Sequence, residues 1–330
     1  MRILVIGSNS FSGTHFVDQC LQRGDKVYGV SRSEEPNKIY LPYKWRDIEK
    51  GSFEFTRINM NTHIKELMKI IDNNEIEYIV NFAAQGMVAE SWQKPVEWYE
   101  TNVISQVAFH EELRHRKFLK KYVHITTPEV YGSTGKKWVT EKQRFNPSTP
   151  YAVSRASCDM HLRSFYNAYK FPVIFTRAAN VYGPGQQLYR IIPKTILSIK
   201  KGVKLTLDGG GNSRRSFIHI GDVVEATLKL IDRAEVGTEW HISTKEIITI
   251  KSLVERICKE MGACLEDVVV EGEERLGKDQ EYMLGSDKIR EEMEWEEKVT
   301  LKEGITDTIK WVQQNFEMMD RSEMNYVHKH

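Results

Sequence analysis

Short apolar runs rich in β-branched residues alternate with longer amphipathic stretches through the first half of the chain. The runs that predict strands lie at residues 2–6, 26–30, 53–58, 78–83, 121–126 and 172–177. Between them, residues 63–72 and 96–113 follow the helical period. Because continuous apolar runs suit strands buried on both faces of a parallel sheet, this order predicts a doubly wound α/β fold.

The rhythm changes after about residue 180, where a GPGQQ turn, a helix near 189–200 and a glycine cluster at 207–217 follow one another. This change predicts a second, smaller lobe of mixed α/β structure. The last residues, 321–330, are polar and are interpreted as a frayed tail. The expected division is a large domain at 1–177 with a returning segment near 217–243, and a smaller lobe at 178–216 and 244–330.

Composition excludes several classes of partner. Lys and Arg total 47 against 46 Asp and Glu, so no net positive field would hold a nucleic acid or an anionic membrane. No apolar stretch approaches the ~18 residues of a membrane-spanning helix. The four cysteines form no CxxC pair, and no histidine pair has the spacing of metal ligands. We therefore expect a cytoplasmic protein without a membrane segment, a disulfide framework or a metal site.

A glycine-bearing turn follows the first predicted strand. It reads Gly7-Ser-Asn-Ser10-Phe11-Ser-Gly13, with serine where a dinucleotide-binding turn usually has its middle glycine. Glycine lets backbone N–H groups and a helix N-terminus approach a pyrophosphate closely. At the first strand–helix junction of a βαβ unit, the turn predicts a Rossmann sheet that binds a nicotinamide dinucleotide.

The end of the second predicted strand bears on which dinucleotide is bound. An acidic residue there would accept hydrogen bonds from a ribose 2′-hydroxyl, but the sequence has Ser31 and Arg32 instead. An arginine can pair with a 2′-phosphate through its planar fork, so NADP is favoured over NAD. The alternative is that Arg32 stacks on the adenine or lies in solvent.

Three further motifs are TTPEVYG at 126–132, PYAVSR at 150–155 and NVYGPG at 180–185. Together with the glycine turn they resemble the extended short-chain dehydrogenase/reductase superfamily, and within it the nucleotide-sugar 4,6-dehydratases. The resemblance covers nearly the whole chain. It implies an enzyme that oxidises a nucleoside-diphosphate hexose at carbon 4 with bound NAD(P), eliminates water across carbons 5 and 6, and returns the hydride to give a 4-keto-6-deoxy sugar.

Tyr151 and Arg155 lie four residues apart and would share a helix face, where the cation can lower the pKa of the phenol. The resemblance implies that Tyr151 is the base, that Thr127 holds the same sugar oxygen, and that Glu129 removes the proton at carbon 5. The sequence departs from the family pattern at two positions. Arg155 stands where the family has lysine, and Pro128 stands where the dTDP-glucose enzymes have a proton-donating aspartate.

The resemblance also implies the remaining contacts and assigns the smaller lobe to the nucleotide sugar. The expected cofactor residues beyond the glycine turn and the second strand are Asn59, Met60, Ala83, Ala84, Tyr151 and Arg155. The expected substrate residues are Gln85, Ser91, Thr127, Pro128, Asn180, Arg215 and Arg275. The alternatives are 5,6-dehydration, 4-epimerisation or hexuronate decarboxylation, and, outside catalysis, a cofactor-binding or regulatory protein.

Apolar residues on two predicted helices bear on assembly. The stripes are Trp98, Val103, Val107 and Phe109 on 96–113, and Val153, Met160, Leu162, Phe165 and Tyr166 on 150–169. They exceed what one sheet face is expected to cover, and family members pair through these helices, so a homodimer is predicted. The alternative is that both stripes belong to the core of one chain.

Overall fold

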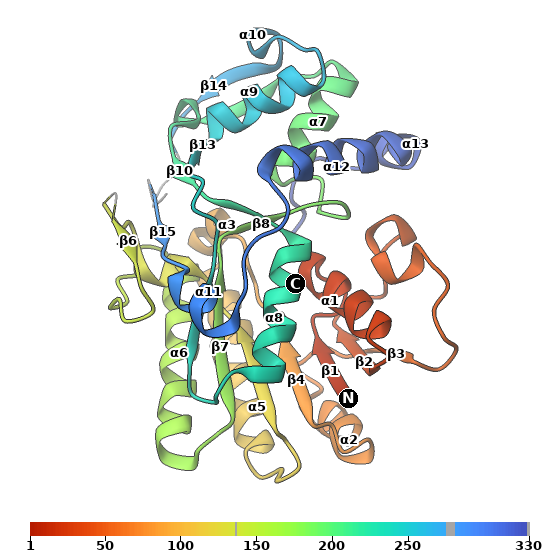
Figure 1. The fold of residues 1–330 in the computed structure, drawn as a ribbon, viewed down its shortest axis with the longest axis vertical. Coiled ribbons are helices and arrows are strands. Elements are labelled where there is room, and N and C mark those ends of the chain that lie inside the picture. The colour runs from red at the N-terminus through yellow and green to blue at the C-terminus, as the bar shows by residue number, and fades with distance from the viewer. Residues whose placement is uncertain (136, 275–280, 329–330) are drawn as a thin grey trace.

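The computed structural model describes residues 1–135, 137–274 and 281–328. Its centre is a seven-stranded parallel sheet in the order β12, β7, β5, β4, β1, β2, β3 (Figure 1). The strands are β1 (Arg2–Ile6), β2 (Lys26–Ser31), β3 (Phe53–Arg57), β4 (Tyr78–Asn81), β5 (Lys121–Ile125), β7 (Val173–Ala178) and β12 (Glu239–Ile242). All six apolar runs form strands of this sheet, and the doubly wound α/β fold is confirmed.

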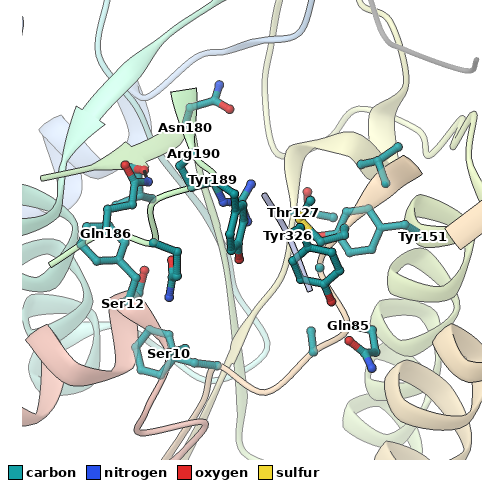
Figure 2. Close-up of a pocket in the computed structure, with 18 of the residues that line it drawn as sticks. Ser10, Ser12, Gln85, Thr127, Tyr151, Asn180, Gln186, Tyr189, Arg190 and Tyr326 are labelled. Carbon is teal, nitrogen blue, oxygen red and sulfur yellow. Dashed lines mark hydrogen bonds between the residues drawn. The ribbon is translucent and has the colours of Figure 1, made fainter. Parts of the chain in front are cut away.

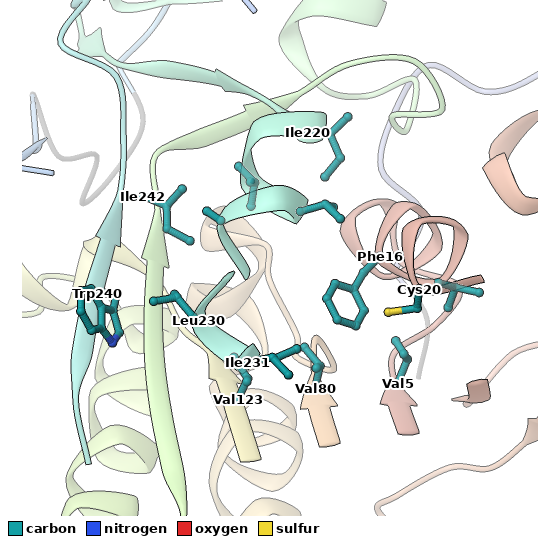
Figure 3. Close-up of a cluster of buried hydrophobic side chains, with 14 of the residues drawn as sticks. Val5, Phe16, Cys20, Val80, Val123, Ile220, Leu230, Ile231, Trp240 and Ile242 are labelled. Atoms are coloured by element: carbon teal, nitrogen blue, oxygen red, sulfur yellow. The ribbon is translucent and has the colours of Figure 1, made fainter. Parts of the chain in front are cut away.

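Helices cover both faces of the sheet. One face packs on α1 (Phe11–Gln22) and α8 (Ile220–Arg233), and the other on α2 (Ile64–Asn73), α5 (Ser105–Leu113) and α6 (Pro150–Tyr169). Alternate residues of each strand supply the two cores, as the two-residue period of a strand requires. Figure 3 shows the first core, whose labelled members are Val5, Phe16, Cys20, Val80, Val123, Ile220, Leu230, Ile231, Trp240 and Ile242.

After β7 the chain leaves the sheet, builds much of a second group of elements, and returns through α8 to place β12 at the sheet edge. A separate apolar core lies among α7 (Ile191–Lys201), α9 (Ile250–Glu260) and α12 (Leu301–Gln314).

No helix of the described residues is long and apolar enough to cross a membrane. The remaining elements are α3 (Val88–Gln93), α4 (Pro95–Tyr99), β6 (Trp138–Val139), β8 (Asn180–Tyr182), β9 (Leu205–Asp208), β10 (Arg214–Arg215), β11 (Phe217–His219), β13 (Ile248–Thr249), α10 (Leu265–Val268), β14 (Val269–Gly272), β15 (Met283–Leu284), α11 (Asp287–Met293) and α13 (Phe316–Asp320), with 3₁₀ turns at Lys38–Tyr40, Pro42–Lys44, Pro128–Tyr131 and Gly209–Gly211.

The helix predicted over 96–113 is not continuous. A π-helical turn at Glu100–Ile104 separates α4 from α5. Within it, the Asn102 side chain accepts from the Gln85 N–H at 2.8 Å and donates to the Ser154 hydroxyl at 3.0 Å. The wider turn thus places a buried amide between the loop after β4 and helix α6, in keeping with the use of π-turns at functional sites.

Much of the apolar stripe expected at a dimer surface is buried within one chain. Trp98, Phe109 and Leu162 have no exposed surface, so their assignment to an outward-facing stripe is wrong. Phe109 and Leu162 face inward because α5 and α6 both pack on the sheet, and the Trp98 ring of α4 stacks on the His328 ring. Ile104 and Met160 do face outward, with exposed fractions of 65% and 58%.

Buried charges fasten α6 to the sheet. The Asp159 carboxylate accepts from Arg177 of β7 at 2.6 Å and from the Thr126 hydroxyl at 3.0 Å. Arg177 also donates to Glu239 of β12 at 2.7 Å. Burial alone would raise the pKa of Asp159, but Arg177, His124 and Arg155 together hold that pKa below its ordinary value. Asp159 therefore remains charged and joins α6 to the strand end that precedes TTPEVYG.

Asp159→Asn is expected to lower the free energy of unfolding by about 3–5 kcal/mol, because it weakens a buried ion pair and leaves Arg177 poorly compensated. The matched control Thr126→Val removes one hydrogen bond and should lower the free energy of unfolding by about 1 kcal/mol. Urea denaturation at pH 7 measures both changes.

The pH dependence of the free energy of unfolding shows whether the charge on Asp159 stabilises the fold. Because the folded-state pKa is depressed, the stabilisation is complete above the unfolded-state pKa of about 4 and is lost as the pH falls through the folded-state value. The stability curves of the native chain and Asp159→Asn should therefore converge in acid. Equal stability of the two at pH 7 would contradict this role.

Candidate active site

A cleft of ≈ 1230 Å³ lies at the carboxyl ends of the central strands. Its walls come from the turn between β1 and α1, the loops after β2, β4 and β5, the start of α6, and residues before and within α7. It is lined by most of the residues predicted from the sequence, namely Gly7, Ser10, Phe11, Ser31, Arg32, Asn59, Met60, Ala83, Ala84, Gln85, Thr127, Pro128, Glu129, Tyr151, Arg155, Asn180 and Arg215.

Two predicted residues that the structure describes are not among those that line the cleft. Gly13 lies under the glycine turn, and Ser91 is fully buried, where its hydroxyl donates to the Val88 carbonyl at 2.6 Å. Arg275 lies outside the described residues. Ser91 thus stabilises the first turn of α3 in this structure, at a distance from the cleft surface.

The glycine turn brings strand, turn and helix into contact. Gly7 has φ +79°, and a Cβ there would lie 2.8 Å from the Ala83 nitrogen, so only glycine fits between β1 and the loop after β4. A Cβ at Gly13 would lie 2.3 Å from the Gly7 carbonyl oxygen. Ser10 has an extended backbone that needs no glycine, and its hydroxyl accepts from the Gly13 N–H at 3.1 Å as the N-cap of α1.

This arrangement fits a dinucleotide. The capping bond leaves the N–H groups of Phe11 and Ser12 without intrahelical partners at the helix N-terminus, where an anion is favoured. The Ser31 hydroxyl accepts from the Asn9 N–H at 3.0 Å, which fixes the turn against the end of β2. Arg32 follows with its guanidinium 3.5 Å from the Gln85 side-chain oxygen.

The TTPEVYG segment forms a single 3₁₀ turn after β5. Thr127 caps it, accepting from the Glu129 N–H at 3.3 Å, and Pro128 is its first residue. Proline suits that position because no N–H is needed there and its φ is already helical. Thr127 has the extended backbone that a residue before proline favours, at φ −140° and ψ 145°. Thr127, Pro128 and Glu129 all line the cleft.

Tyr151 lies in the first turn of α6 and is hydrogen-bonded to Thr127. Burial raises the pKa of its phenol, and the nearby Glu129 adds to the rise. Arg155 and the Thr127 hydrogen bond lower it, as expected of a cation one turn away, but burial outweighs them. The phenol is therefore neutral in the ligand-free chain: Arg155 lowers its pKa in the expected direction, but burial raises it by more.

Arg155 is almost wholly buried beneath Tyr151 and donates to the Ile125 carbonyl oxygen. Among the described residues its Nε has no hydrogen-bond partner. A buried guanidinium N–H left unpaired in a cleft wall is unfavourable until a ligand accepts from it. Other atoms of Arg155 line the cleft, so its guanidinium places a positive charge under this wall of the site.

The opposite wall is built around Tyr282, which the sequence reasoning missed. Its hydroxyl donates to the Asn180 side-chain oxygen at 3.3 Å, and the Arg215 guanidinium lies 4.5 Å from its ring centre. Burial raises the pKa of Tyr282 to about 12. Its position seven residues after Arg275, at the end of the same ERLGKDQEY segment, was the available signal.

Two further parts of the wall were also missed. Tyr189 and Arg190, which directly follow the GPGQQ turn and one leucine, line the cleft before α7. Tyr326, from the segment interpreted as a frayed tail, lines it too. In the view of Figure 2 its ring lies between Tyr189 and Tyr151. No local pattern marks Tyr326, because only the tertiary fold brings it to the cleft.

Comparison with known proteins gives the same picture over nearly the whole chain. The family model for GDP-mannose 4,6-dehydratase matches residues 4–308. Human dTDP-D-glucose 4,6-dehydratase is 28% identical, with 96% of this chain and 91% of that protein covered. Among solved structures, dTDP-glucose 4,6-dehydratase from Streptomyces venezuelae with NAD bound has TM-score 0.89 at 27% identity, covering 96% of this chain and 98% of that one.

The corresponding enzyme from Bacillus anthracis, in complex with NAD, has TM-score 0.86 at 30% identity, covering 96% of this chain and 98% of that one. The resemblance inferred from the glycine turn, TTPEVYG and PYAVSR is confirmed, and the chain belongs to the GDP-mannose 4,6-dehydratase family of NAD-dependent nucleotide-sugar enzymes.

Proposed function

We propose that this chain is a nucleoside-diphosphate-hexose 4,6-dehydratase that yields a 4-keto-6-deoxy sugar. The observation that carries the proposal is the shared wall of Thr127, Glu129 and Tyr151, with Thr127 hydrogen-bonded to the phenol and Arg155 one turn beneath it. The relatives named dTDP-glucose 4,6-dehydratase support the same reaction. A regulatory protein without catalytic activity would not need Thr127, Glu129 and Tyr151 to line the same cleft.

The cofactor, when bound, accepts a hydride from carbon 4 and later returns one to carbon 6. Tyr151 removes the proton of the carbon 4 hydroxyl, and the Thr127 hydroxyl beside the phenol holds the same sugar oxygen. Arg155 stabilises the phenolate formed. An oxidised nicotinamide held at this wall would add a positive charge to the site and so lower the pKa of a phenol that burial keeps neutral, which would leave more of Tyr151 as the phenolate that acts as base.

Glu129 then acts on the neighbouring carbon. The ketone at carbon 4 makes the proton at carbon 5 acidic, and the Glu129 carboxylate removes it. Pro128 cannot protonate the departing hydroxyl at carbon 6. The protonated Glu129 is the donor we propose, passing the proton from carbon 5 to the leaving oxygen so that water departs. When the hydride returns to carbon 6, a proton from solvent reaches carbon 5 through the Glu129 carboxylate, and Tyr151 releases to solvent the proton that it took from the carbon 4 hydroxyl. The rigid 3₁₀ turn that begins at Pro128 holds Glu129 at this position.

Glu129→Gln should reduce dehydration by about 10²–10⁴-fold, because it removes the carbon 5 base, while nucleotide-sugar affinity is retained. The assay offers dTDP-glucose, UDP-glucose, CDP-glucose and GDP-mannose and follows loss of water by mass spectrometry. Since a 5,6-unsaturated isomer has the same mass, NMR must identify the ketone at carbon 4. Undiminished turnover of Glu129→Gln would remove Glu129 from the mechanism.

Pro128→Asp, tested in the same assay, supplies the aspartate of the dTDP-glucose enzymes. If Glu129 is the donor, turnover should rise or hold with an unchanged product. A change of product in this variant would show that Pro128 selects the reaction, and 5,6-dehydration would replace our assignment. Release of carbon dioxide from a nucleotide hexuronate by the native chain would instead establish a decarboxylase.

We further propose that NADP is the preferred dinucleotide. Support comes from Ser31 and Arg32 in the cleft wall at the end of β2, with no carboxylate at either position. The solved relatives were obtained with NAD, so this proposal would separate the chain from them. Ser31 is available to donate to a 2′-phosphate, and Arg32 can neutralise it.

Arg32→Gln should weaken NADP⁺ binding by about 10–100-fold and leave NAD⁺ binding nearly unchanged, because only the 2′-phosphate loses its charged partner. Arg233→Gln is the matched control, since this exposed arginine is paired with Glu294 at 3.3 Å and is not among the residues of the cleft wall. Calorimetric titration measures both ligands. Tighter binding of NAD⁺ than NADP⁺ by the native chain would refute the preference.

A homodimer is proposed from the surface that remains exposed on these helices. Val96, Ile104 and Met160 are 66%, 65% and 58% exposed, more than is usual for such large apolar side chains. Ile104→Glu should convert a dimer to a monomer, because it would bury a charge at the interface. Val203→Glu, at an exposed site before β9, is the control, and light scattering reads the mass. A monomeric native chain at micromolar concentration would reject the dimer.

The remaining assignments are proposals of the same kind. The returning strand β12 supports a cofactor domain at 1–177 and 217–243, and the core of α7, α9 and α12 supports a nucleotide-sugar lobe at 178–216 and 244–330. The four unpaired cysteines are compatible with the reducing cytoplasm that we propose as the location.

A further inference from the structure

The segment at residues 321–328, here the C-terminal strap, follows α13 and is fastened at both ends. Near its start, the Asn325 side-chain oxygen accepts from Lys194 of α7 at 3.1 Å. At its far end, the His328 ring stacks on Trp98 of α4, with ring centres 5.3 Å apart and planes 11° apart. The strap therefore bridges two parts of the fold, and its interpretation as a frayed tail is wrong for these residues.

Tyr326 is held in the cleft by this strap. Its ring packs edge-on against Tyr189 with centres 5.2 Å apart. Its hydroxyl lies 3.3 Å from Nδ1 of His328, whose Nε2 lies 2.5 Å from a Glu97 carboxylate oxygen. The contact with Glu97 and the stacking on Trp98 fix His328, and His328 in turn orients the phenol of Tyr326.

Two cations act on the Tyr326 phenol. Burial raises its pKa, Tyr189 and Glu90 add to the rise, and Arg32 and Arg190 oppose it. The phenol is therefore neutral and carries one proton, which it can donate to Nδ1 of His328 or, by rotation about its C–O bond, to a ligand in the cleft. Arg32 comes from the end of β2 and Arg190 from the residue before α7, so they reach Tyr326 from different parts of the cleft wall.

We propose that Tyr326 is a ligand-contacting residue that determines affinity, and that its hydroxyl donates to a phosphate group held between Arg32 and Arg190. A neutral donor beside two guanidinium groups is suited to a phosphate, which accepts several hydrogen bonds and is attracted by both charges. The inference rests on the proposed function for its two sources of phosphate, the dinucleotide and the nucleotide sugar.

The strap forms a wall of the site and does not fill it. With the strap in place the cleft still measures ≈ 1230 Å³, and Tyr326 and Val327 are among its lining residues. Val327 is 59% exposed, so part of the strap's apolar surface remains uncovered in the ligand-free chain. A wall of this kind adds contacts to a bound ligand and shields the phosphates from water, which strengthens each polar contact.

The test is calorimetric titration of the full chain with NADP⁺, NAD⁺, dTDP and UDP. Tyr326→Phe removes only the hydroxyl and should weaken one class of ligand by about tenfold, the value of one hydrogen bond to a charged group. Deletion of residues 323–330 should weaken it further. Glu323→Ala, at an exposed position of the same strap, is the matched control and should bind as the native chain does.

The ligands distinguish the two sources of phosphate. A loss confined to NADP⁺ places its 2′-phosphate beside Tyr326, in line with the role proposed for Arg32, and a loss shared by NADP⁺ and NAD⁺ places their pyrophosphate there. A loss confined to dTDP and UDP places the diphosphate of the nucleotide sugar beside Tyr326. Thermal melting verifies that each variant is folded. Tighter binding after deletion would show that the strap competes with ligands, and unchanged binding would show that it contacts none; either result overturns the proposal.

These measurements do not depend on turnover. A chain that binds both ligands and responds to Tyr326→Phe, but releases no water from any hexose, would refute the proposed dehydration and leave the role of the strap intact. A chain that dehydrates its substrate, but whose ligand binding is unchanged by Tyr326→Phe and by the deletion, would support the proposed dehydration and refute the role of the strap.

Discussion

The parallel sheet imposes one constraint on which the site depends: every strand ends at the same edge. The glycine turn follows β1, Arg32 follows β2, Ala83 follows β4 and Thr127 follows β5, so segments far apart in sequence meet at one cleft. From β1 the chain first adds β2 and β3 on one side and then β4, β5 and β7 on the other, so the order of strands reverses between β1 and β4. Ligands of doubly wound sheets bind at such a switch point. At this boundary the backbone of Gly7 packs directly against the backbone of Ala83.

Helix α6 connects this edge to the buried charges of the fold. Tyr151, Arg155 and Asp159 follow one another at intervals of four residues and so share a face of the helix. Asp159 is bound to Arg177 within the sheet, and Arg155 is bound to the end of β5. The position of the phenol thus depends on an ion pair that contacts no ligand. Burial is the dominant influence on that phenol, which explains why a cation one turn away does not ionise it.

The strands were predictable because a strand buried on both faces leaves a continuous apolar run, as in β1 and β7. The edge strand β12 reads EWHI, which contains no continuous apolar run. Its polar residue His241 is buried, and the His241 ring lies 2.8 Å from the Tyr131 hydroxyl. The π-turn arises from the long-range contacts of Asn102, and a helical period cannot reveal it. The motifs located most of the cleft wall, but Tyr282 and Tyr326 reach it only through tertiary contacts.

Net charge and local charge differ sharply in this molecule. The chain carries a formal charge of only +1, yet the described residues of the cleft wall include the cations Arg32, Arg155, Arg190, Lys194 and Arg215 against the carboxylates Glu129 and Asp208. The field of such a cluster is screened beyond about 8 Å at physiological ionic strength. It therefore acts on phosphates that have entered the cleft and leaves polyanions outside it unattracted. That short range allows a nearly neutral chain to select small dianionic ligands, and it makes the arrangement of the individual guanidinium groups, more than their number, the basis of selectivity.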